Sequence, residues 1–186
     1  MDLIKLGYTV HWIDYGVLTK DQFLKQEEDF NKSDGIRTEH YRAETFSNWI
    51  KSRDRITETE LKQFLYLVKS DPNELMAGMA ISELYSSELL TDSQFEYLTN
   101  KLSLFGDWTT KLISREVLKR RVLNEPITEE IYLDCLKYKK QFKDNRLMFL
   151  LIKRTKDISI LEKFESNGSG KQIRTLAAKK IKKLSK

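Results

Sequence analysis

The chain has 186 residues, of which 40% are hydrophobic and 33% are charged, and its formal net charge at pH 7 is +5. Its longest apolar run, residues 147–152, excludes a membrane-spanning helix, because such a helix needs about 20 apolar residues. One cysteine, Cys135, excludes an intramolecular disulfide. With no signal-peptide pattern in the first residues, we expect a soluble, cytoplasmic protein.

Taken in chain order, the sequence predicts about eleven helices that pair as hairpins. Residues 2–16 are expected to contain a helix that ends at Gly16. The helices expected after it are 19–32, 38–53, 58–70, 74–86, 92–103, 108–123, 128–142, 146–155, 159–165 and 171–186. Turn signals separate them, among them Gly35, Pro72, Gly106 and the segment 167–170.

A short phrase recurs where the first helix of each hairpin begins: an aliphatic residue, a hydroxyl residue, two or three polar residues and an apolar helical start. The hydroxyl positions are Thr19, Thr57, Thr91, Thr128 and, in a degenerate fifth copy, Ser159. Each hydroxyl is expected to be an N-cap that accepts a hydrogen bond from a backbone N–H of the first turn. The copies are 31 to 38 residues apart, a period typical of stacked helical repeats.

The last two hairpins differ in polarity. Residues 147–152 are apolar all round, which predicts a helix covered on both sides. The final helix carries a single apolar stripe, formed by Ile173, Leu176, Ala177, Ile181 and Leu184. A penultimate unit that is buried and a terminal unit with one wet face are what a stack requires.

The capped first helices and second helices such as residues 75–81 resemble the HEAT-like and armadillo-like α-solenoid superfamily. This resemblance implies an all-α, right-handed, α-solenoid-like stack of about five helical hairpins. It implies one domain, 1–186, with approximate units 1–53, 54–87, 88–124, 125–156 and 157–186. An irregular helical bundle with coincidental spacing is the alternative.

Charge is distributed unevenly along the chain. Residues 1–100 carry 11 Lys or Arg and 18 Asp or Glu, whereas residues 101–186 carry 22 and 10. This asymmetry suggests a nucleic acid or an acidic partner for the basic half. The candidate binding residues are Lys111, Arg115, Lys119, Arg120, Lys153, Arg154, Lys179 and Lys183. A lysine-rich solvated face is the alternative interpretation. Because Lys outnumbers Arg near the end and aromatic residues are sparse, such binding would follow the phosphate backbone without reading sequence.

Aromatic residues with polar tips gather near the N-terminus. Tyr8, Trp12, Tyr15 and Trp49 are candidates for a protein interface, where Tyr and Trp are enriched. Equally, they would fill the core at one end of a stack.

Evidence for catalysis is slight. Cys135 lies between apolar helical positions and is expected to be a buried structural thiol. His11 and His40 have no partner at ligand spacing, so the sequence predicts no metal and no cofactor. We therefore expect a non-enzymatic scaffold or adaptor for a protein partner. The alternatives are a nucleic-acid-binding protein that uses residues 101–186 and, less favoured, a HEAT-like alkylated-base DNA glycosylase built around Asp107 and Trp108.

Overall fold

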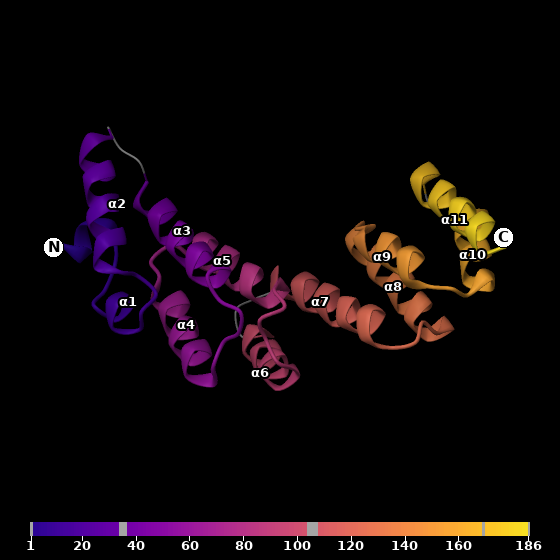
Figure 1. Cartoon of the computed structure of the whole chain (residues 1–186), viewed down its shortest axis with the longest axis horizontal. Helices are drawn as coiled ribbons and strands as arrows, with labels where there is room; N and C mark the ends of the chain where they lie inside the picture. The colour runs from indigo at the N-terminus through magenta and orange to yellow at the C-terminus, as the bar shows by residue number, and fades with distance from the viewer. Residues whose placement is uncertain (1, 34–36, 104–107, 169, 186) are drawn as a thin grey trace. The chain divides into compact units, whose positions relative to one another are not determined.

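The protein is all-helical, as predicted (Figure 1). The computed structural model describes residues 2–33, 37–103, 108–168 and 170–185, and among these residues there are eleven α-helices, one 3-10 helix and no strand. The chain divides into two compact units, residues 1–101 (the N-terminal unit) and residues 102–186 (the C-terminal unit). The predicted right-handed stack of five hairpins stays a prediction.

The observed helices follow the predicted order closely. The N-terminal unit begins with the 3-10 helix η1, Leu3–Leu6. The α-helices are α1 His11–Asp14, α2 Lys20–Lys32, α3 Thr38–Lys51, α4 Glu58–Ser70, α5 Glu74–Ser86, α6 Asp92–Leu102, α7 Trp108–Asn124, α8 Glu129–Phe142, α9 Arg146–Arg154, α10 Ile158–Asn167 and α11 Lys171–Leu184. The predicted turn residues Gly35 and Gly106 lie outside the described residues.

Four of the five predicted N-caps are confirmed. Thr19 and Thr57 each form a complete capping box, with Gln22 and Glu60 as their respective partners. Thr91 accepts from the backbone N–H of the third residue on, at 3.3 Å, and Thr128 does the same, at 3.3 Å. These local hydrogen bonds explain why the repeated phrase marks helix starts.

The fifth predicted N-cap, Ser159, is wrong. Helix α10 begins at Ile158, and its cap is Asp157, whose Oδ1 accepts from the N–H groups of Ser159 at 2.8 Å and Ile160 at 3.4 Å. The Ser159 hydroxyl also donates to this carboxylate. The Asp157 carboxylate, two positions before Ser159, accepts hydrogen bonds from backbone N–H groups of the first turn that have no partner within the helix. The positive end of the helix dipole also stabilises its negative charge.

The first residues form less helix than predicted. Residues 2–16 contain the 3-10 turn η1 and the one-turn helix α1, and they end at Gly16 with φ +66°. Gly7, with φ +75°, separates the two pieces and lies against the guanidinium of Arg42. Both glycines occupy the left-handed region that other residues rarely adopt.

Aromatic side chains form the core of the N-terminal unit. The ring of Trp12 lies 4.3 Å from that of Phe46, which in turn contacts Phe64 edge to face at 5.1 Å. Trp49 stacks on the same Phe64 at 5.5 Å. These rings come from α1, α3 and α4, so they join three helices into one core.

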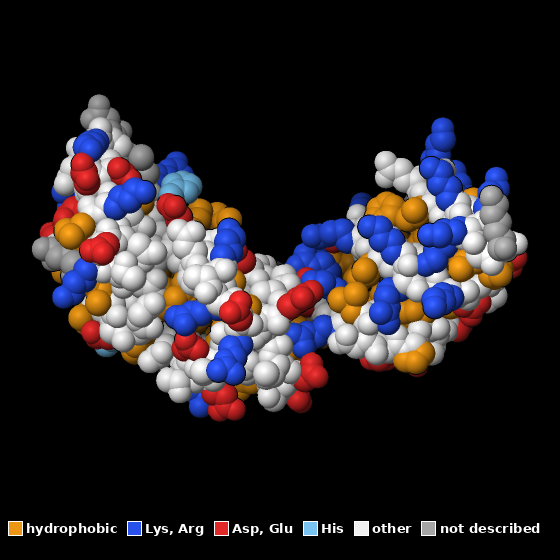
Figure 2. Space-filling view, in the orientation of Figure 1, with side chains coloured by type: hydrophobic (Ala, Val, Ile, Leu, Met, Phe, Trp, Pro, Cys, Tyr) orange, Lys and Arg blue, Asp and Glu red, His pale blue; other side chains and the backbone are white. Residues whose placement is uncertain are grey.

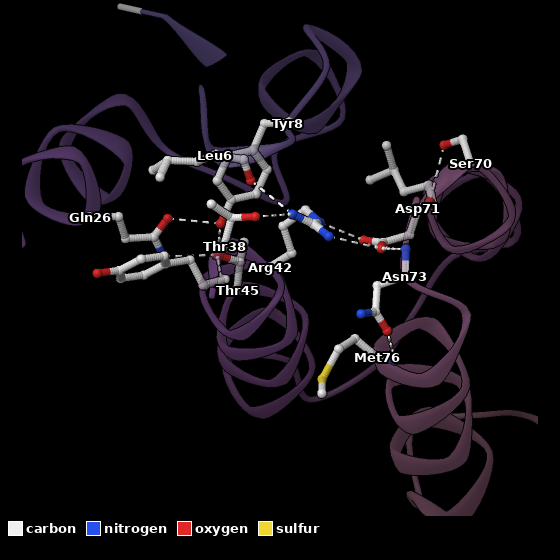
Figure 3. A network of polar contacts seen from close by, with 12 residues as sticks. Leu6, Tyr8, Gln26, Thr38, Arg42, Thr45, Ser70, Asp71, Asn73 and Met76 are labelled. Carbon is white, nitrogen blue, oxygen red and sulfur yellow. Dashed lines mark hydrogen bonds and ion pairs between the residues drawn. The ribbon is translucent and has the colours of Figure 1, made fainter. Parts of the chain in front are cut away.

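A buried ion pair connects α3 to Asp71, which ends α4 in the turn before α5 (Figure 3). Arg42 donates from Nε to Asp71 Oδ2 at 2.9 Å and from Nη2 to Asp71 Oδ1 at 3.2 Å. Its Nη1 donates to the Leu6 carbonyl at 2.9 Å. The side chains are 3% and 0% exposed, so the pair is fully removed from water. This arrangement fixes η1, α3 and α5 relative to one another.

The C-terminal unit has an aliphatic core. Helix α9 contributes Leu147, Met148, Leu151 and Ile152, all buried, and α11 contributes Ile173 and Ala177. The remaining apolar residues of α9, Phe149 and Leu150, are only partly buried. The predicted covering of this helix on both sides is therefore partial.

Candidate polyanion-binding surface

The two units carry opposite charge. The N-terminal unit has 12 Lys or Arg and 18 Asp or Glu, a net charge of −6, whereas the C-terminal unit has 21 and 10, a net charge of +11. Helix α11 alone has six basic residues and no acidic one. Figure 2 shows Lys and Arg side chains over much of the visible face of α9 and α11. These two helices together carry nine of the 21 Lys and Arg residues of the C-terminal unit.

The hydrophobic core orients these basic side chains outward. Helices α9 and α11 lie side by side, with Ile152 and Ala177 in the same core cluster. Because α9 buries the face that includes Leu151 and Ile152, Lys153 and Arg154 at its end are exposed. Burial of the apolar faces of α9 and α11 in the core therefore leaves the basic side chains of both helices on the solvent-exposed faces.

Lys180 of α11 reaches back to α9. Its Nζ donates a hydrogen bond to the backbone carbonyl of Lys153, near the C-terminal end of α9, where carbonyl groups lack partners within the helix. Burial, followed by the positive charges of Lys156 and Lys183, holds the pKa of Lys180 below its usual range. Lys180 therefore lies beside the end of α9, where the backbone of Lys153 accepts its hydrogen bond, and near the charges of Lys156, in the loop between α9 and α10, and Lys183 of α11. The side chains of Lys153, Lys156 and Lys183 are exposed. We call Lys153, Lys156, Lys180 and Lys183 the lysine cluster.

The charges of the lysine cluster are not neutralised within the part of the chain that the structure describes. Each of the observed ion pairs of the C-terminal unit involves other residues, and none joins a carboxylate to Lys153, Lys156, Lys180 or Lys183. Lysines that repel one another at close range cost free energy unless an anion lies between them. Such a cluster is suited to hold phosphate or carboxylate groups.

The basic residues of α7 are in a different situation. Arg115 and Lys119 both bind Glu116, at 2.6 Å and 3.2 Å, and Glu116 is itself buried. Arg121 binds three carboxylates, those of Glu125, Glu130 and Asp134, the last at 2.7 Å. Its hydrogen bonds to α8 give it a structural role in joining α7 to that helix. The candidate residues of α7 therefore provide less free charge than the sequence indicates.

The structure brings together only part of the predicted basic set. Lys153 and Lys183 belong to the lysine cluster, while Arg154 and Lys179 are exposed on the same two helices. Lys111 is exposed on α7, and Arg120 is partly buried there.

Sequence reasoning did not select Lys156 or Lys180 as site residues. Lys180 lies at the edge of the apolar stripe of α11, three residues after Ala177, and this position was the available signal that it faces a neighbouring helix. Lys156 is in a loop, where helical periodicity gives no information about direction.

Three of the four aromatic interface candidates are core residues. Tyr8 and Trp12 are each 2% exposed and Trp49 is 5% exposed. The hydroxyl of Tyr8 forms hydrogen bonds with Gln26 and Thr45, both at 2.8 Å, so it has polar partners inside the protein in place of water. Tyr15 is partly exposed, and its ring stacks on His11 at 5.3 Å.

The structure describes only some of the residues considered for catalysis. Cys135 is fully buried, and burial raises the pKa of its thiol to about 12, as expected of a structural cysteine. Asp107 and the side chain of Trp108, which the glycosylase interpretation requires, lie outside the described residues. In the described ranges, no three His, Cys, Asp or Glu side chains are grouped as metal ligands would be. None of the helices described is both long and apolar enough to cross a membrane.

Comparison with known proteins gives no relative: no protein-family model, no curated protein and no solved structure matches this chain.

Proposed function

We propose that this protein is a non-enzymatic binding protein whose C-terminal unit holds the sugar–phosphate backbone of a nucleic acid on the lysine cluster. The observation that carries the proposal is the hydrogen bond from Lys180 of α11 to the end of α9, beside the exposed Lys153, Lys156 and Lys183, none of which has a carboxylate partner in the described parts of the chain. Binding at such a cluster releases counterions from the nucleic acid, and this release drives association.

The chemistry of the surface favours a duplex bound without sequence readout. Lysine is a compact point charge that neutralises phosphates but does not match base edges as the forked guanidinium of Arg does. The exposed large apolar residues described in the C-terminal unit are Leu133, Ile158 and Leu184, and none of them is aromatic. Single strands are usually held by stacking on aromatic rings, so this surface lacks their main contact.

The test is a fluorescence-anisotropy titration of the full-length protein with a mixed-sequence DNA duplex at several salt concentrations. Four lysine–phosphate contacts predict a slope of log K against log salt of about −3.6. Replacement of Lys156 and Lys183 by Ala should weaken binding by about tenfold or more and reduce this slope by about 2. These two residues are chosen because Lys180 also has a packing role in joining α11 to α9.

A matched control separates a local site from net charge. Lys137 and Lys140 are exposed on α8 of the same unit, and replacing both by Ala removes the same charge. We expect this control to bind nearly as tightly as the unmodified protein. Equal losses in the two double variants would show that only net charge matters and would refute the site.

We infer a HEAT-like or armadillo-like arrangement for the helices themselves. Two observations support it: capped first helices recur at Thr19, Thr57, Thr91 and Thr128, and α3 and α5, the second helices of consecutive hairpins, run in the same direction. Repeats of this kind provide extended binding surfaces. A scaffold that also binds a protein partner is therefore the second candidate function, and the N-terminal unit offers a surface for it.

A further inference from the structure

Helix α5 has apolar residues on two opposite sides, and only one of them is covered. Ala80, Ile81 and Leu84 face the core and are buried. On the other side, Leu75 is 69% exposed and Met79 is 56% exposed. A helix that is apolar all round is usually covered on both sides. The outer side of α5 therefore has the composition of an interface, without a covering element among the residues that the structure describes.

Leu75 and Met79 belong to one continuous line of residues. They are followed at the same helical spacing by Glu83, so the three side chains lie on one face of α5. Glu83 accepts a hydrogen bond from Ser47 of α3 at 2.9 Å and pairs with Lys51 at 3.6 Å. The line on α5 therefore runs beside α3.

The two helices are parallel, which defines an extended surface. Arg42, near the start of α3, binds Asp71, just before α5, whereas the Glu83 contacts join the ends of the same helices. Ala43 is one turn before Ser47 on α3, and both are small and partly exposed. We call Ala43, Ser47, Leu75, Met79 and Glu83 the α3–α5 surface. In Figure 2, hydrophobic side chains are exposed above these helices.

The charge around the α3–α5 surface is acidic. Helix α5 carries Glu74 and Glu83 and no basic residue. Helix α3 carries Glu39, Glu44 and Lys51 on partly or fully exposed positions. Its one arginine, Arg42, is buried with Asp71 and adds no exposed charge. The exposed and partly exposed positions of α3 and α5 therefore carry four carboxylates and one ammonium, that of Lys51, which pairs with Glu83, within a unit whose net charge is −6.

We propose that the α3–α5 surface is a docking site for a basic amphipathic helix of a partner protein. Leu75 and Met79 would take the apolar face of that helix, because anchors one turn apart match the side-chain spacing of helix-on-helix recognition. The glutamates of α3 and α5 would attract Lys or Arg on the flanks of the incoming helix and repel an acidic one. Met79 adds an adaptable contact, since the methionine side chain fits differing partners.

The inference is tested with synthetic helical peptides of about 18 residues and the full-length protein, by fluorescence anisotropy. One peptide has a Leu face and Lys flanks, a second has the same Leu face with Glu flanks, and a third has the first composition in scrambled order. We expect the Leu/Lys peptide to bind about tenfold or more tightly than either of the others. Equal binding of the scrambled peptide would refute the proposal, because charge alone would then account for the affinity.

Substitutions locate the binding. The double variant Leu75→Gln/Met79→Gln should weaken the Leu/Lys peptide by about tenfold or more, because it removes both apolar contacts. Leu133→Gln, at a 52% exposed leucine of the C-terminal unit, is the matched control and should not change the affinity. Circular dichroism verifies that both variants remain folded.

Two further outcomes would overturn the proposal. If the affinity of the Leu/Lys peptide were the same in the double variant and in the control, the peptide would be bound elsewhere. If the protein alone formed a dimer by sedimentation velocity and the double variant did not, the occupant would be a second copy of this chain. The variant Lys156→Ala/Lys183→Ala should bind the peptide normally, so failure of the nucleic-acid proposal would leave this test intact.

Discussion

Replacement of Arg42 by Ala is expected to destabilise the N-terminal unit severely. Arg42 and Asp71 form a bidentate pair with distances of 2.9 and 3.2 Å and side-chain exposures of 3% and 0%. In the Arg42→Ala variant the carboxylate of Asp71 would stay buried with only the N–H of Asn73, at 2.8 Å, as a partner. The Leu6 carbonyl would also lose its donor.

The expected loss in free energy of unfolding is about 3–5 kcal/mol, the usual cost of leaving one charge of a buried pair alone. Urea unfolding of the full-length protein, followed by the fluorescence of the buried Trp12 and Trp49, measures this loss. Lys51→Ala, which breaks a pair whose side chains are 69% and 35% exposed, is the control and should cost less than about 1 kcal/mol.

A double variant distinguishes the mechanism from a simple packing defect. Arg42→Met combined with Asp71→Leu removes both charges and fills most of the volume, so it should be less destabilising than Arg42→Ala. The reasoning would be refuted if Arg42→Ala cost no more than the exposed control. It would also fail if the double variant were as unstable as Arg42→Ala, because the cost would then not come from an unpaired charge.

Three further outcomes are expected. Gly7→Ala should lower the melting temperature more than Gly16→Ala, because both have positive φ but only a Cβ at Gly7 would meet a side chain, at 2.4 Å; equal effects would contradict this. Asp157→Ala should lower the melting temperature more than Ser159→Ala, since the carboxylate is the N-cap of α10; the reverse order in thermal unfolding would restore the hydroxyl as the cap. Hydrogen bonds from the neighbouring guanidinium hold the pKa of Asp144 below its usual range, so its contribution to stability is present above about pH 4 and lost below it. The stability gap between the unmodified protein and Asp144→Asn should therefore narrow as urea unfolding is repeated from about pH 5 down to about pH 2, and a constant gap would contradict this linkage.

Helix starts could be predicted because the signals are local. The hydrogen bonds of Thr19 and Thr57 join residues three apart, so the sequence contains both partners side by side. Ser159 failed for a local reason too. Asp157 and Ser159 are both good caps, and the spacing of the repeated phrase favoured the hydroxyl, whereas the carboxylate reaches two N–H groups.

Exposure of the aromatic residues could not be predicted from residue type. Tyr8 has a polar tip, but Gln26 and Thr45, far along the chain, satisfy it inside the protein. Tyr66, by contrast, is 49% exposed on α4, whose one other aromatic ring, that of Phe64, is buried. Which tyrosine is buried depends on the helices that pack beside it, and single-helix periodicity does not contain that information.

The basic surface shows the same limit. The neutralising partner of Arg115 and Lys119 is Glu116, which lies between them in the sequence and could have been weighed. The partners of Arg121 on α8 and the gathering of lysines around Lys180 depend on tertiary packing. Counting charges therefore gave α7 as many candidate residues as α9 and α11 together, although the ion pairs of Glu116 and Arg121 reduce the free charge of α7.

The separation of charge between the two units gives a reason for both proposed surfaces to be selective. A nucleic acid is negatively charged and a basic helix is positively charged. A surface of mixed charge would therefore discriminate poorly between these two ligands. The N-terminal unit, with a net charge of −6, repels phosphates, and the C-terminal unit, with a net charge of +11, repels a Lys-rich helix.

The salt dependence of binding should differ between the two proposed surfaces. Raising it from about 50 to about 200 mM should weaken duplex binding by roughly a hundredfold for four phosphate contacts, since no apolar contact compensates. The Leu/Lys peptide should lose much less, because the contacts of Leu75 and Met79 do not depend on ionic strength. Equal salt sensitivity of the two ligands would mean that charge alone holds both.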